Sequence, residues 1–588
     1  DVAPSRGLGD VYKRQILYLV VNTTMKRGAK IMYLDYLVDI PEVKGKITFR
    51  SKGNARYVYY EYDRIYDSNK KYTTVRRVTI GKVSADDESK MRPNENFKKY
   101  FPEVEVPEEL ATVRSSCLKA GTYMVISKTV KDMGLDKKLE DTFGVKAAGM
   151  ILDFASYSII TEGNAAQYYP DYAYNHPLFT PGMKIYSDST ISDFFRSINE
   201  NQRQDFLDSW NEERNKRERI YISYESTNKN CEAGNISIVE FGATKIDTGL
   251  LVFNYAVGYD ITNSEPLLYE KYPRSIDDVS QLQFMLEKVK GYGYKNIGFI
   301  LDRGYFSQEN LRFMDSNGFG FIIMVKGCKE FICNQIRKQK GTFENDWGNQ
   351  IAEFGVYGKT IHTLVYSADT KKRYVHIYYS AAKAAGERAR LEESIQEMQS
   401  YLNRFQDTEY EFGPAFHKFF HLHYNNDTGH FVYGEPKLQV IRDELNLCGY
   451  FAIISSEKMD AKKAISLYKN RDASEKVFRA DKSYLGNHCL RVASEEAASN
   501  KIFIGFIALI IRCRLYTALK DKAAEMVKKP NYLTIPAAIR ELEKIEITRQ
   551  LDKIYRLDHA VSKTQKVVLS AFGISAEQVK YKSNYICL

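Results

Sequence analysis

The sequence predicts an α/β fold, in which an RNase H-like core is interrupted by a β-rich insertion and is flanked by an N-terminal β meander with a helical region and by a helical C-terminal tail. From Arg219 onward, helical patterns give way to three short strand-like segments, a helix and a further apolar strand. This order opens an RNase H-like fold, and a carboxylate, Asp302, directly follows one of the apolar strands. Hydrophobic residues make up 44% and charged residues 27% of the chain, which is typical of soluble globular proteins. At 588 residues the chain is too long for one core, so we expect three to five domains or subdomains.

The N-terminal region predicts a leader followed by a β meander. Residues 1–24 contain a stretch that resembles translated sequencing-adapter sequence, and we predict that they are non-native or disordered, with the start at Met25 or Met32. Residues 46–83 alternate apolar and polar side chains, which favours antiparallel strands. Together with a linker rich in Asp, Glu and Pro, they form a predicted segment of residues 25–105.

A helical segment is predicted over residues 106–216. Ala147–Thr161 is one clear helical pattern, and Asp188-Ser-Thr190 opens another as an N-terminal cap signal. No sharp helix-turn-helix signature stands out in this segment.

The first part of the predicted core covers residues 217–329. The expected strands are Arg219–Tyr224, Ser237–Phe241, Leu250–Val257, Asn296–Leu301 and Gly320–Val325. Helices are expected from Asp277 to Lys290 and from Gln308 onward. Three antiparallel strands would therefore be followed by a helix and two further strands.

A β-rich insertion is predicted over residues 330–455. Its expected elements are strands at Ile361–Ser367, Arg373–Tyr379 and Phe416–Tyr424, and a charged surface helix at Ala382–Arg404. The core would resume over residues 456–530 with helices at 459–483 and 494–526, and residues 531–588 would form a helical C-terminal region.

Charge and cysteine usage narrow the class of protein. The 85 basic and 75 acidic residues give a net charge of +10, which permits a polyanionic partner without proving one. The eight cysteines form no C-x-x-C pair, so neither a zinc ribbon nor a disulfide framework is indicated, and a reducing cytoplasm fits. The longest apolar run, Phe503–Ile511, is too short to span a bilayer and predicts a buried helix, so no membrane partner is expected.

One spacing pattern combines a carboxylate with cationic and hydroxyl side chains. Tyr468, Arg471, Glu475 and Lys482 follow the pattern Y-x2-R-x3-E-x6-K. On one helix these four side chains would fall within an arc of roughly 60°; if the helix begins only near Asn470 or Asp472, the last three still share a face. A carboxylate can hold a divalent metal, and the cationic groups can hold phosphate. The alternative interpretation is a solvated charged face.

The pattern and its surroundings resemble a known family. The segments L-Y-K-N-R-D-A-S-E-K, F-I-L-D-R-G-Y-F-S and N-Y-L-T-I-P-A-A-I-R-E-L-E-K resemble the YREK-type DDE transposases of bacterial insertion sequences, namely insertion-sequence family four and its long relatives. The similarity runs from about residue 27 to the C-terminus. It implies an RNase H-like catalytic core with a β-rich insertion between the second and third acidic residues, and a DNA-binding role for the helical segment 106–216.

The resemblance also implies a catalytic set. Asp302 and Glu475 would be metal ligands, and Tyr468, Arg471 and Lys482 would bind DNA phosphates. The family has D-S-T after the first strand, where this chain has Glu225-Ser-Thr227. We place Glu225 at the first catalytic position, as a working variant, a decayed copy or a sequencing error, and expect impaired activity.

Two other carboxylates were weighed for the first position. Glu232 lies off the predicted strand, and Asp188 precedes a helix.

The resemblance implies a DNA-joining enzyme of the bacterial, nucleoid-associated cytoplasm. Its cofactor would be two Mg²⁺ ions, for which Mn²⁺ can substitute, and its reactions phosphodiester hydrolysis and transesterification. Its partners would be double-stranded DNA with terminal inverted repeats, target DNA, and a second copy of the chain, paired through the C-terminal helices. The alternatives are a catalytically dead end-binding protein that acts as a repressor, and a metal-dependent nuclease without strand transfer.

Overall fold

The chain divides into two compact units. Unit 1 comprises residues 1–113 and 549–554, and unit 2 comprises residues 114–548 and 555–588. The predicted leader, residues 1–24, lies outside the described residues. The computed structural model describes residues 36–53, 55–67, 71–84, 87–104, 114–232, 236–242, 250–276, 278–325, 330–487, 489–492, 494–528, 530–550 and 554–586.

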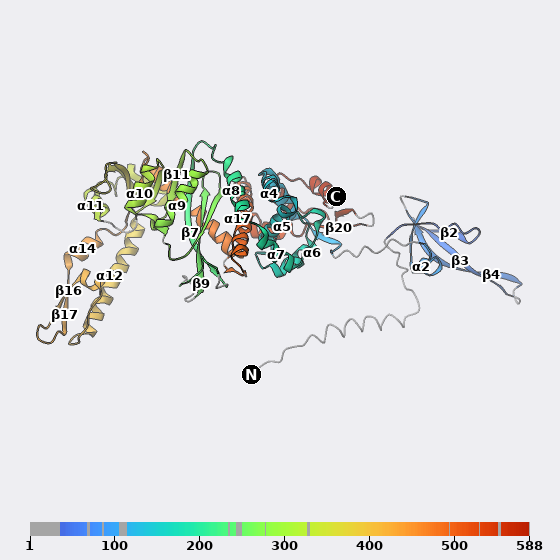
Figure 1. The fold of residues 1–588 in the computed structure, drawn as a ribbon, viewed down its shortest axis with the longest axis horizontal. Coiled ribbons are helices and arrows are strands. Elements are labelled where there is room, and N and C mark those ends of the chain that lie inside the picture. Colours follow the sequence, from blue (N-terminus) through green and yellow to red (C-terminus); the bar gives the residue numbers. More distant parts are fainter. Residues whose placement is uncertain are drawn as a thin grey trace. The chain divides into compact units, whose positions relative to one another are not determined.

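Unit 1 is built around a five-stranded sheet in the order β1-β5-β4-β3-β2 (Figure 1). Its described neighbours are all antiparallel, so the predicted meander is confirmed. Val58, Ile80, Met91 and Phe97 form a small buried core. The elements are β1 (Val38–Asp39), β2 (Ile47–Lys52), β3 (Ala55–Asp67), β4 (Tyr72–Val83), β5 (Lys90–Pro93) and α2 (Glu95–Tyr100).

The first part of unit 2 is mainly helical, as predicted, after the short strand β6. These helices share one hydrophobic core with the sheet and with the C-terminal elements, because buried side chains from Leu118 to Val579 form one cluster. Ser187, the residue before Asp188, caps α7 by accepting a hydrogen bond from the backbone N–H of Thr190. The elements are β6 (Cys117–Lys119), α3 (Gly121–Asp132), α4 (Leu135–Phe143), α5 (Val145–Thr161), α6 (Tyr169–Asn175), α7 (Asp188–Ser197) and α8 (Glu200–Glu212).

The central sheet of unit 2 runs in the order β10-β9-β7-β11-β12 and then continues into the insertion. β10, β9 and β7 are antiparallel neighbours, whereas β7, β11 and β12 are parallel. This mixed α/β arrangement is consistent with an RNase H-like core. The elements are β7 (Ile220–Cys231), β8 (Glu240–Gly242), β9 (Leu250–Asp260), β10 (Glu265–Tyr272), α9 (Asp278–Gly291), β11 (Ile297–Leu301), α10 (Gln308–Ser316) and β12 (Gly320–Met324).

One predicted strand of the core was assigned wrongly. The second position in the antiparallel set is taken by β9 and the third by β10, whereas the segment predicted at Ser237–Phe241 contributes only the short β8 beside β9. β10 was missed because Pro266 and three charged residues interrupt its apolar pattern, although Pro266 to Tyr269 are buried.

The insertion extends the central sheet. β18 pairs antiparallel with β12, and β15, β14 and β13 follow in turn. Two predicted strands had wrong bounds: Ile361–Ser367 overlaps only the last residues of β14, and Phe416–Tyr424 began too early because residues 414–419 are helical. Its elements are α11 (Glu330–Gln339), β13 (Gln350–Ile351), β14 (Val356–Thr363), β15 (Arg373–Tyr379), α12 (Ala381–Arg404), α13 (Pro414–Phe419), β16 (Phe420–Tyr424), β17 (Phe431–Pro436), α14 (Leu438–Leu445) and β18 (Tyr450–Ser455).

Part of the insertion projects from the sheet as an arm. Figure 1 shows α12 beside the β16–β17 hairpin, with α14 near the base. The arm has a hydrophobic cluster of its own, formed by Leu402, Phe412, Phe419, Phe420 and Phe431. Cys333 of α11 is disulfide-bonded, which the scattered cysteines did not predict.

The core resumes with α15 (Ala461–Lys469), α16 (Asp472–Arg479), a π-helical turn η7 (Ala480–Tyr484), β19 (Cys489–Leu490) and α17 (Glu495–Ala524). α17 packs against α5, α7 and β10, so the predicted buried helix is confirmed. Our length argument was wrong, however: the apolar run belongs to a 30-residue helix that is long and apolar enough to cross a membrane, although 78% of its most apolar window is buried inside the protein.

The C-terminal region is mainly helical but also contains two strands. β20 pairs with β6, so the tail adds to a small sheet at the start of unit 2. Its elements are η8 (Asn531–Leu533), α18 (Ile535–Leu542), β20 (Glu546–Arg549), β21 (Tyr555–Leu557), α19 (Lys563–Ser570) and α20 (Ala576–Ser583).

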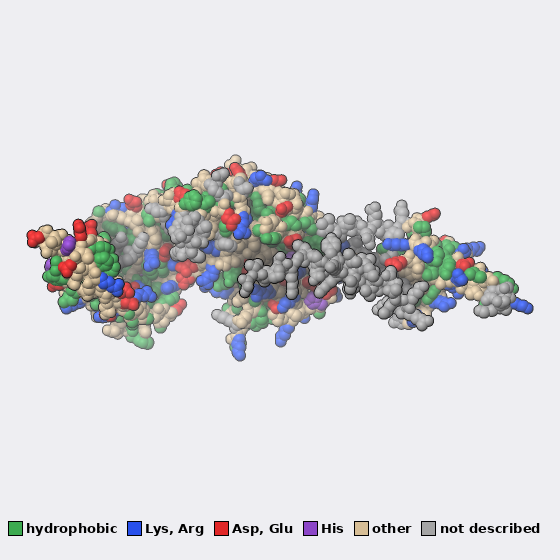
Figure 2. Space-filling view, turned by 90° about the horizontal axis from the view of Figure 1, so that it is seen from below, with side chains coloured by type: hydrophobic (Ala, Val, Ile, Leu, Met, Phe, Trp, Pro, Cys, Tyr) green, Lys and Arg blue, Asp and Glu red, His purple; other side chains and the backbone are tan. Residues whose placement is uncertain are grey.

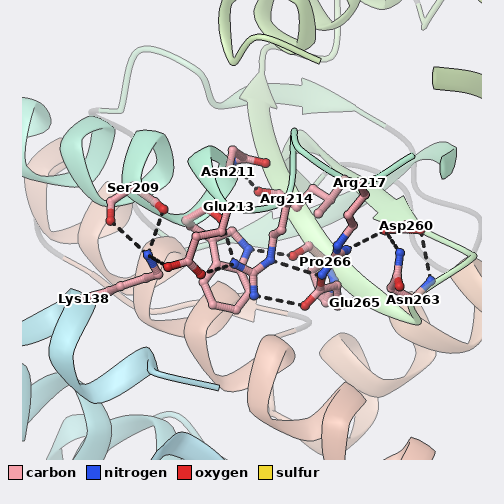
Figure 3. A network of polar contacts seen from close by, with 12 residues as sticks. Lys138, Ser209, Asn211, Glu213, Arg214, Arg217, Asp260, Asn263, Glu265 and Pro266 are labelled. Atoms are coloured by element: carbon pink, nitrogen blue, oxygen red, sulfur yellow. Dashed lines mark hydrogen bonds and ion pairs between the residues drawn. The ribbon is translucent and has the colours of Figure 1, made fainter. Parts of the chain in front are cut away.

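A polar network joins the helical segment to the central sheet (Figure 3). The guanidinium of Arg214 stacks on Trp210, 3.2 Å from the ring centroid, and forms a two-pronged ion pair with Glu265 at 3.1 and 3.2 Å. Arg217 donates to the buried Asp260 at 2.7 Å. These contacts satisfy charges that would otherwise be buried without a partner, and they fix α8 against β9 and β10.

Candidate active site

The sheet register brings the first two predicted carboxylates together. β7 and β11 are parallel, and Leu301 at the end of β11 is paired with Tyr224. The next residue on each strand is therefore Asp302 on one and Glu225 on the other. Carboxyl ends of parallel strands are a common place for functional side chains in α/β folds.

Glu225 lies within a strand rather than at its end. The predicted strand ended at Tyr224, but β7 continues to Cys231 because it pairs with β9 along its whole second half. The Glu225 side chain is 20% exposed and faces the site. The rejected carboxylate Glu232 instead forms an ion pair with Arg491 at 3.0 Å.

Asp302 occupies the position before a short 3₁₀ turn, η4 (Arg303–Tyr305), yet its side chain makes no capping hydrogen bond. Its carboxylate instead accepts a hydrogen bond from the Tyr468 hydroxyl at 3.4 Å. The Asp302 side chain therefore points to Tyr468 and does not cap the turn.

A single helix from Tyr468 to Lys482 is wrong, and the alternative in which a helix begins near Asp472 is confirmed. α15 ends at Lys469, Arg471 lies in the junction, and Glu475 stands on α16. Lys482 lies on the π-helical turn η7, whose wider spacing changes the direction of its side chain. The break follows from backbone hydrogen bonding: the N–H groups of Asn470 and Arg471 bond back to Leu467 and Tyr468 and close α15.

Arg471 joins all three predicted carboxylates. Its Nη1 lies 3.6 Å from Glu225 Oε1 and 3.2 Å from Asp302 Oδ1, and its Nη2 lies 2.8 Å from Glu475 Oε1. The side chain is only 12% exposed. Burial works to lower the pKa of Arg471, but Tyr468 and the three carboxylates outweigh it and raise that pKa. Burial also raises the pKa of Tyr468, which therefore stays a neutral hydrogen-bond donor.

A second, buried ion pair holds this segment against β7. Lys229 Nζ lies 2.5 Å from Asp481 Oδ2, both side chains are almost fully buried, and Asn487 donates to Asp481 at 2.9 Å. Lys229 is four residues after Glu225, so both point to the same side of β7. The sequence did not predict this pair, because the expected strand ended at Tyr224, before Lys229. Lys482 is half-buried beside it.

The donor chemistry of the site suits a hard divalent cation. Three carboxylates from separate elements surround one positive group, and oxygen ligands are what Mg²⁺ prefers. Within the described ranges, no group of three His, Cys, Asp or Glu side chains is arranged to hold a metal ion as it stands. The guanidinium of Arg471 takes the central position instead, so metal binding requires Arg471 to move aside.

We expect the substitution Arg471→Ala to tighten Mn²⁺ binding to the free protein by about tenfold or more. A unit charge about 4 Å away contributes roughly 4 kcal/mol at an effective dielectric constant of 20, before solvent compensates. Titration calorimetry and the paramagnetic signal of free Mn²⁺ measure this without any DNA. Arg303→Ala, at the next residue after Asp302, is the matched control. Equal or weaker Mn²⁺ binding by Arg471→Ala would show that Arg471 does not compete with the metal.

The face shown in Figure 2 has no separate basic surface that would mark a DNA-binding site. On the face shown in Figure 2, Lys and Arg side chains are interspersed with Asp and Glu. The net charge of +10 is therefore not concentrated there, and phosphate contacts have to be sought at particular residues.

A part of the chain that includes most of the candidate active site matches a known protein family. Residues 238–511 match the family model described as "Transposase DDE domain". The match supports a DDE transposase. The segment matched to the transposase domain includes Asp302, Arg471 and Glu475, and it begins after Glu225.

Two solved transposase structures show weak similarity. One is the cryo-EM structure of the piggyBac transposase synaptic complex with hairpin DNA, at 8% identity and a TM-score of 0.29, over 62% of this chain and 57% of that chain. The other is the Drosophila P element transposase strand transfer complex, at 11% identity and a TM-score of 0.18, over 73% and 79% of the two chains. The chain thus spans little more than half of the piggyBac chain, and both scores are too low to carry an argument. Among curated proteins, no match was found.

Proposed function

We propose that the protein is a transposase of the YREK group that binds the ends of an insertion sequence, cuts them and joins them to target DNA. The observation that carries this proposal is the convergence of Glu225, Asp302 and Glu475 on a single guanidinium. They come from β7, from the end of β11 and from α16, and the segment that matches a transposase DDE domain contains Asp302 and Glu475 but not Glu225.

In this proposal Glu225, Asp302 and Glu475 hold two Mg²⁺ ions, with Mn²⁺ as a substitute. Two such Mg²⁺ ions would lower the pKa of an attacking water molecule and stabilise the leaving oxygen. Tyr468 keeps Asp302 oriented through its hydroxyl, and it binds DNA phosphate with Arg471 and Lys482. Arg471 neutralises the three carboxylates in the structure, and its guanidinium would be available to a DNA phosphate if metal ions took over that role.

The proposed partners are double-stranded DNA with terminal inverted repeats, target DNA and a second copy of the chain. The helical segment 106–216 would recognise the ends, and the C-terminal helices would form the homodimer on DNA. We place the protein in the bacterial cytoplasm, associated with the nucleoid.

Cleavage of a supercoiled donor plasmid with matched ends tests the proposal. Asp302→Asn removes a charge from the proposed metal site with little change in shape, so we expect loss of Mg²⁺-dependent cleavage by more than about a hundredfold with end binding retained. Glu393→Gln, on the exposed face of α12, is the control and should leave cleavage unchanged. Full cleavage by Asp302→Asn would contradict the assignment.

The same assay separates the alternatives. Glu225 favours the catalytically dead end-binding protein, because the longer side chain holds its oxygens less firmly than Asp would. That protein would bind ends and cut none of them, with either metal. A nuclease without strand transfer would release cut ends but give no joined product when target plasmid is added.

A further inference from the structure

A pocket of 490 Å³ lies against α16, the helix that also carries Glu475 of the candidate active site. Lys476 and Arg479 of α16 line it, together with Arg512 and Lys520 of α17 and the first residues of α18. Its volume falls within the roughly 300–1,000 Å³ of small-molecule sites. None of its lining residues is Asp or Glu.

Arg512 is the unusual residue of this pocket. Its side chain is 3% exposed, and its Nε and Nη1 atoms are buried without a hydrogen-bond partner. The ring of Tyr484 lies 4.7 Å from the guanidinium, and the negative charge of Glu162 acts on Arg512 without forming an ion pair among the described residues. Burial lowers the pKa of Arg512 to about 10, so the group is still charged at neutral pH. A buried, charged donor without an acceptor is costly, and an anion in the pocket would satisfy it.

The N-terminus of α18 points to the same kind of ligand. Thr534, Ile535 and Pro536 line the pocket, and the Thr534 side chain does not cap the helix but donates to Asn531 O at 3.0 Å. Uncapped N–H groups at a helix start carry partial positive charge and bind phosphate well.

The remaining walls are aromatic and apolar. Tyr259, Tyr484 and Tyr516 line the pocket beside Leu533 and Ile535. Aromatic side chains next to cationic ones are a platform on which a base can stack while its phosphate is held.

We propose that this pocket binds a nucleotide, with its phosphate at Arg512, Lys520 and the start of α18 and its base against the tyrosines. The shared chemistry is a phosphate attached to an aromatic base, supplied either by a free mononucleotide or by a nucleotide within a DNA strand. This site goes beyond the proposed function, because nucleotide binding here does not require the carboxylates to cleave DNA.

Equilibrium binding to the full chain tests the proposal, with thymidine monophosphate, a fluorescent ten-nucleotide thymidine strand and inorganic phosphate as probes. Lost charge-assisted hydrogen bonds should weaken nucleotide binding about tenfold or more in Arg512→Met and several-fold in Lys520→Ala. Lys520 is exposed, so the second variant keeps the test valid if Arg512→Met does not fold. Arg514→Ala, an exposed arginine of the same helix outside the pocket, is the matched control.

The probes also identify the source of the nucleotide. Weakened binding of thymidine monophosphate in both pocket variants, but not in Arg514→Ala, supports a free-nucleotide site. Weakened binding of the strand alone supports a site for a DNA nucleotide. Binding of inorganic phosphate as tight as that of the nucleotides, or equal binding of every probe by wild type and both variants, overturns the proposal. Asp302→Asn should bind all probes normally, so failure of the catalytic assignment would be visible separately.

Discussion

Glu225→Asp is expected to increase Mg²⁺-dependent cleavage of transposon ends about a hundredfold. Glu225 approaches Arg471 from the middle of β7, where its backbone is fixed by pairing with Val257. The backbone therefore cannot retreat to make room for the extra methylene, so the longer side chain must fold back. A misplacement of about 1 Å at a reacting centre can cost about a hundredfold in rate. The measurement compares plasmid cleavage by the two forms at equal occupancy of the ends.

Glu225→Gln provides the matched control for this experiment, because it keeps the length of the side chain and removes its charge. It should cleave no better than the original chain. Equal cleavage by Glu225→Asp and the original chain would show that Glu is tolerated. No cleavage by any form would mean that another residue supplies the first carboxylate, or that the chain carries further lesions.

Lys229→Ala is expected to destabilise unit 2 by about 3–5 kcal/mol. The substitution leaves Asp481 buried among apolar and aromatic side chains without its cation, and breaking one side of a buried pair has this cost. Chemical unfolding followed by tryptophan fluorescence suits the measurement, because Trp210 is fully buried in the same unit.

Two variants test whether the ion pair itself is responsible. Lys229→Met combined with Asp481→Leu should recover most of the lost stability, since apolar residues of similar volume often replace a buried pair without loss. Arg388→Ala breaks an exposed pair with Glu392 on α12 and should change stability by less than about 1 kcal/mol. A loss in Lys229→Ala no larger than in Arg388→Ala would contradict our interpretation.

Most helices and strands that have a clear apolar pattern within their own residues were predicted from that pattern. α5, α9, α12, β11, β12 and β15 begin and end within about two residues of the predicted bounds, and α10 begins at the predicted residue. Asp302 was placed correctly for the same reason, because a run of five buried apolar residues ends directly before it. The convergence of Glu225, Asp302 and Glu475 was also expected, but only through the family resemblance and not from the spacing alone.

The features that were not predicted depend on tertiary contacts. β7 continues past Glu225 because β9 offers a partner along residues 252–260, and nothing within the β7 sequence signals that partner. The break between α15 and α16 places Arg471 in the centre of the site, whereas helical periodicity placed it on a continuous face. The pairing of Lys229 with Asp481 joins residues far apart in the chain, so only the folded sheet reveals it.

Tyr379 pairs with Tyr450 at the base of the insertion. This pairing divides the insertion into two parts that differ in how well they tolerate inserted, deleted or replaced residues. The chain leaves the sheet after Tyr379 and returns at Tyr450, so the arm between them is attached like an overgrown hairpin loop. Such a loop can be lengthened, shortened or exchanged for a foreign module without altering the strands that support it. β14, β15 and β18 have no such freedom, because their removal would expose the backbone edge of β12 and its apolar side chains to other molecules. Fusion of a tag or a targeting module at the arm is thus compatible with an intact catalytic sheet.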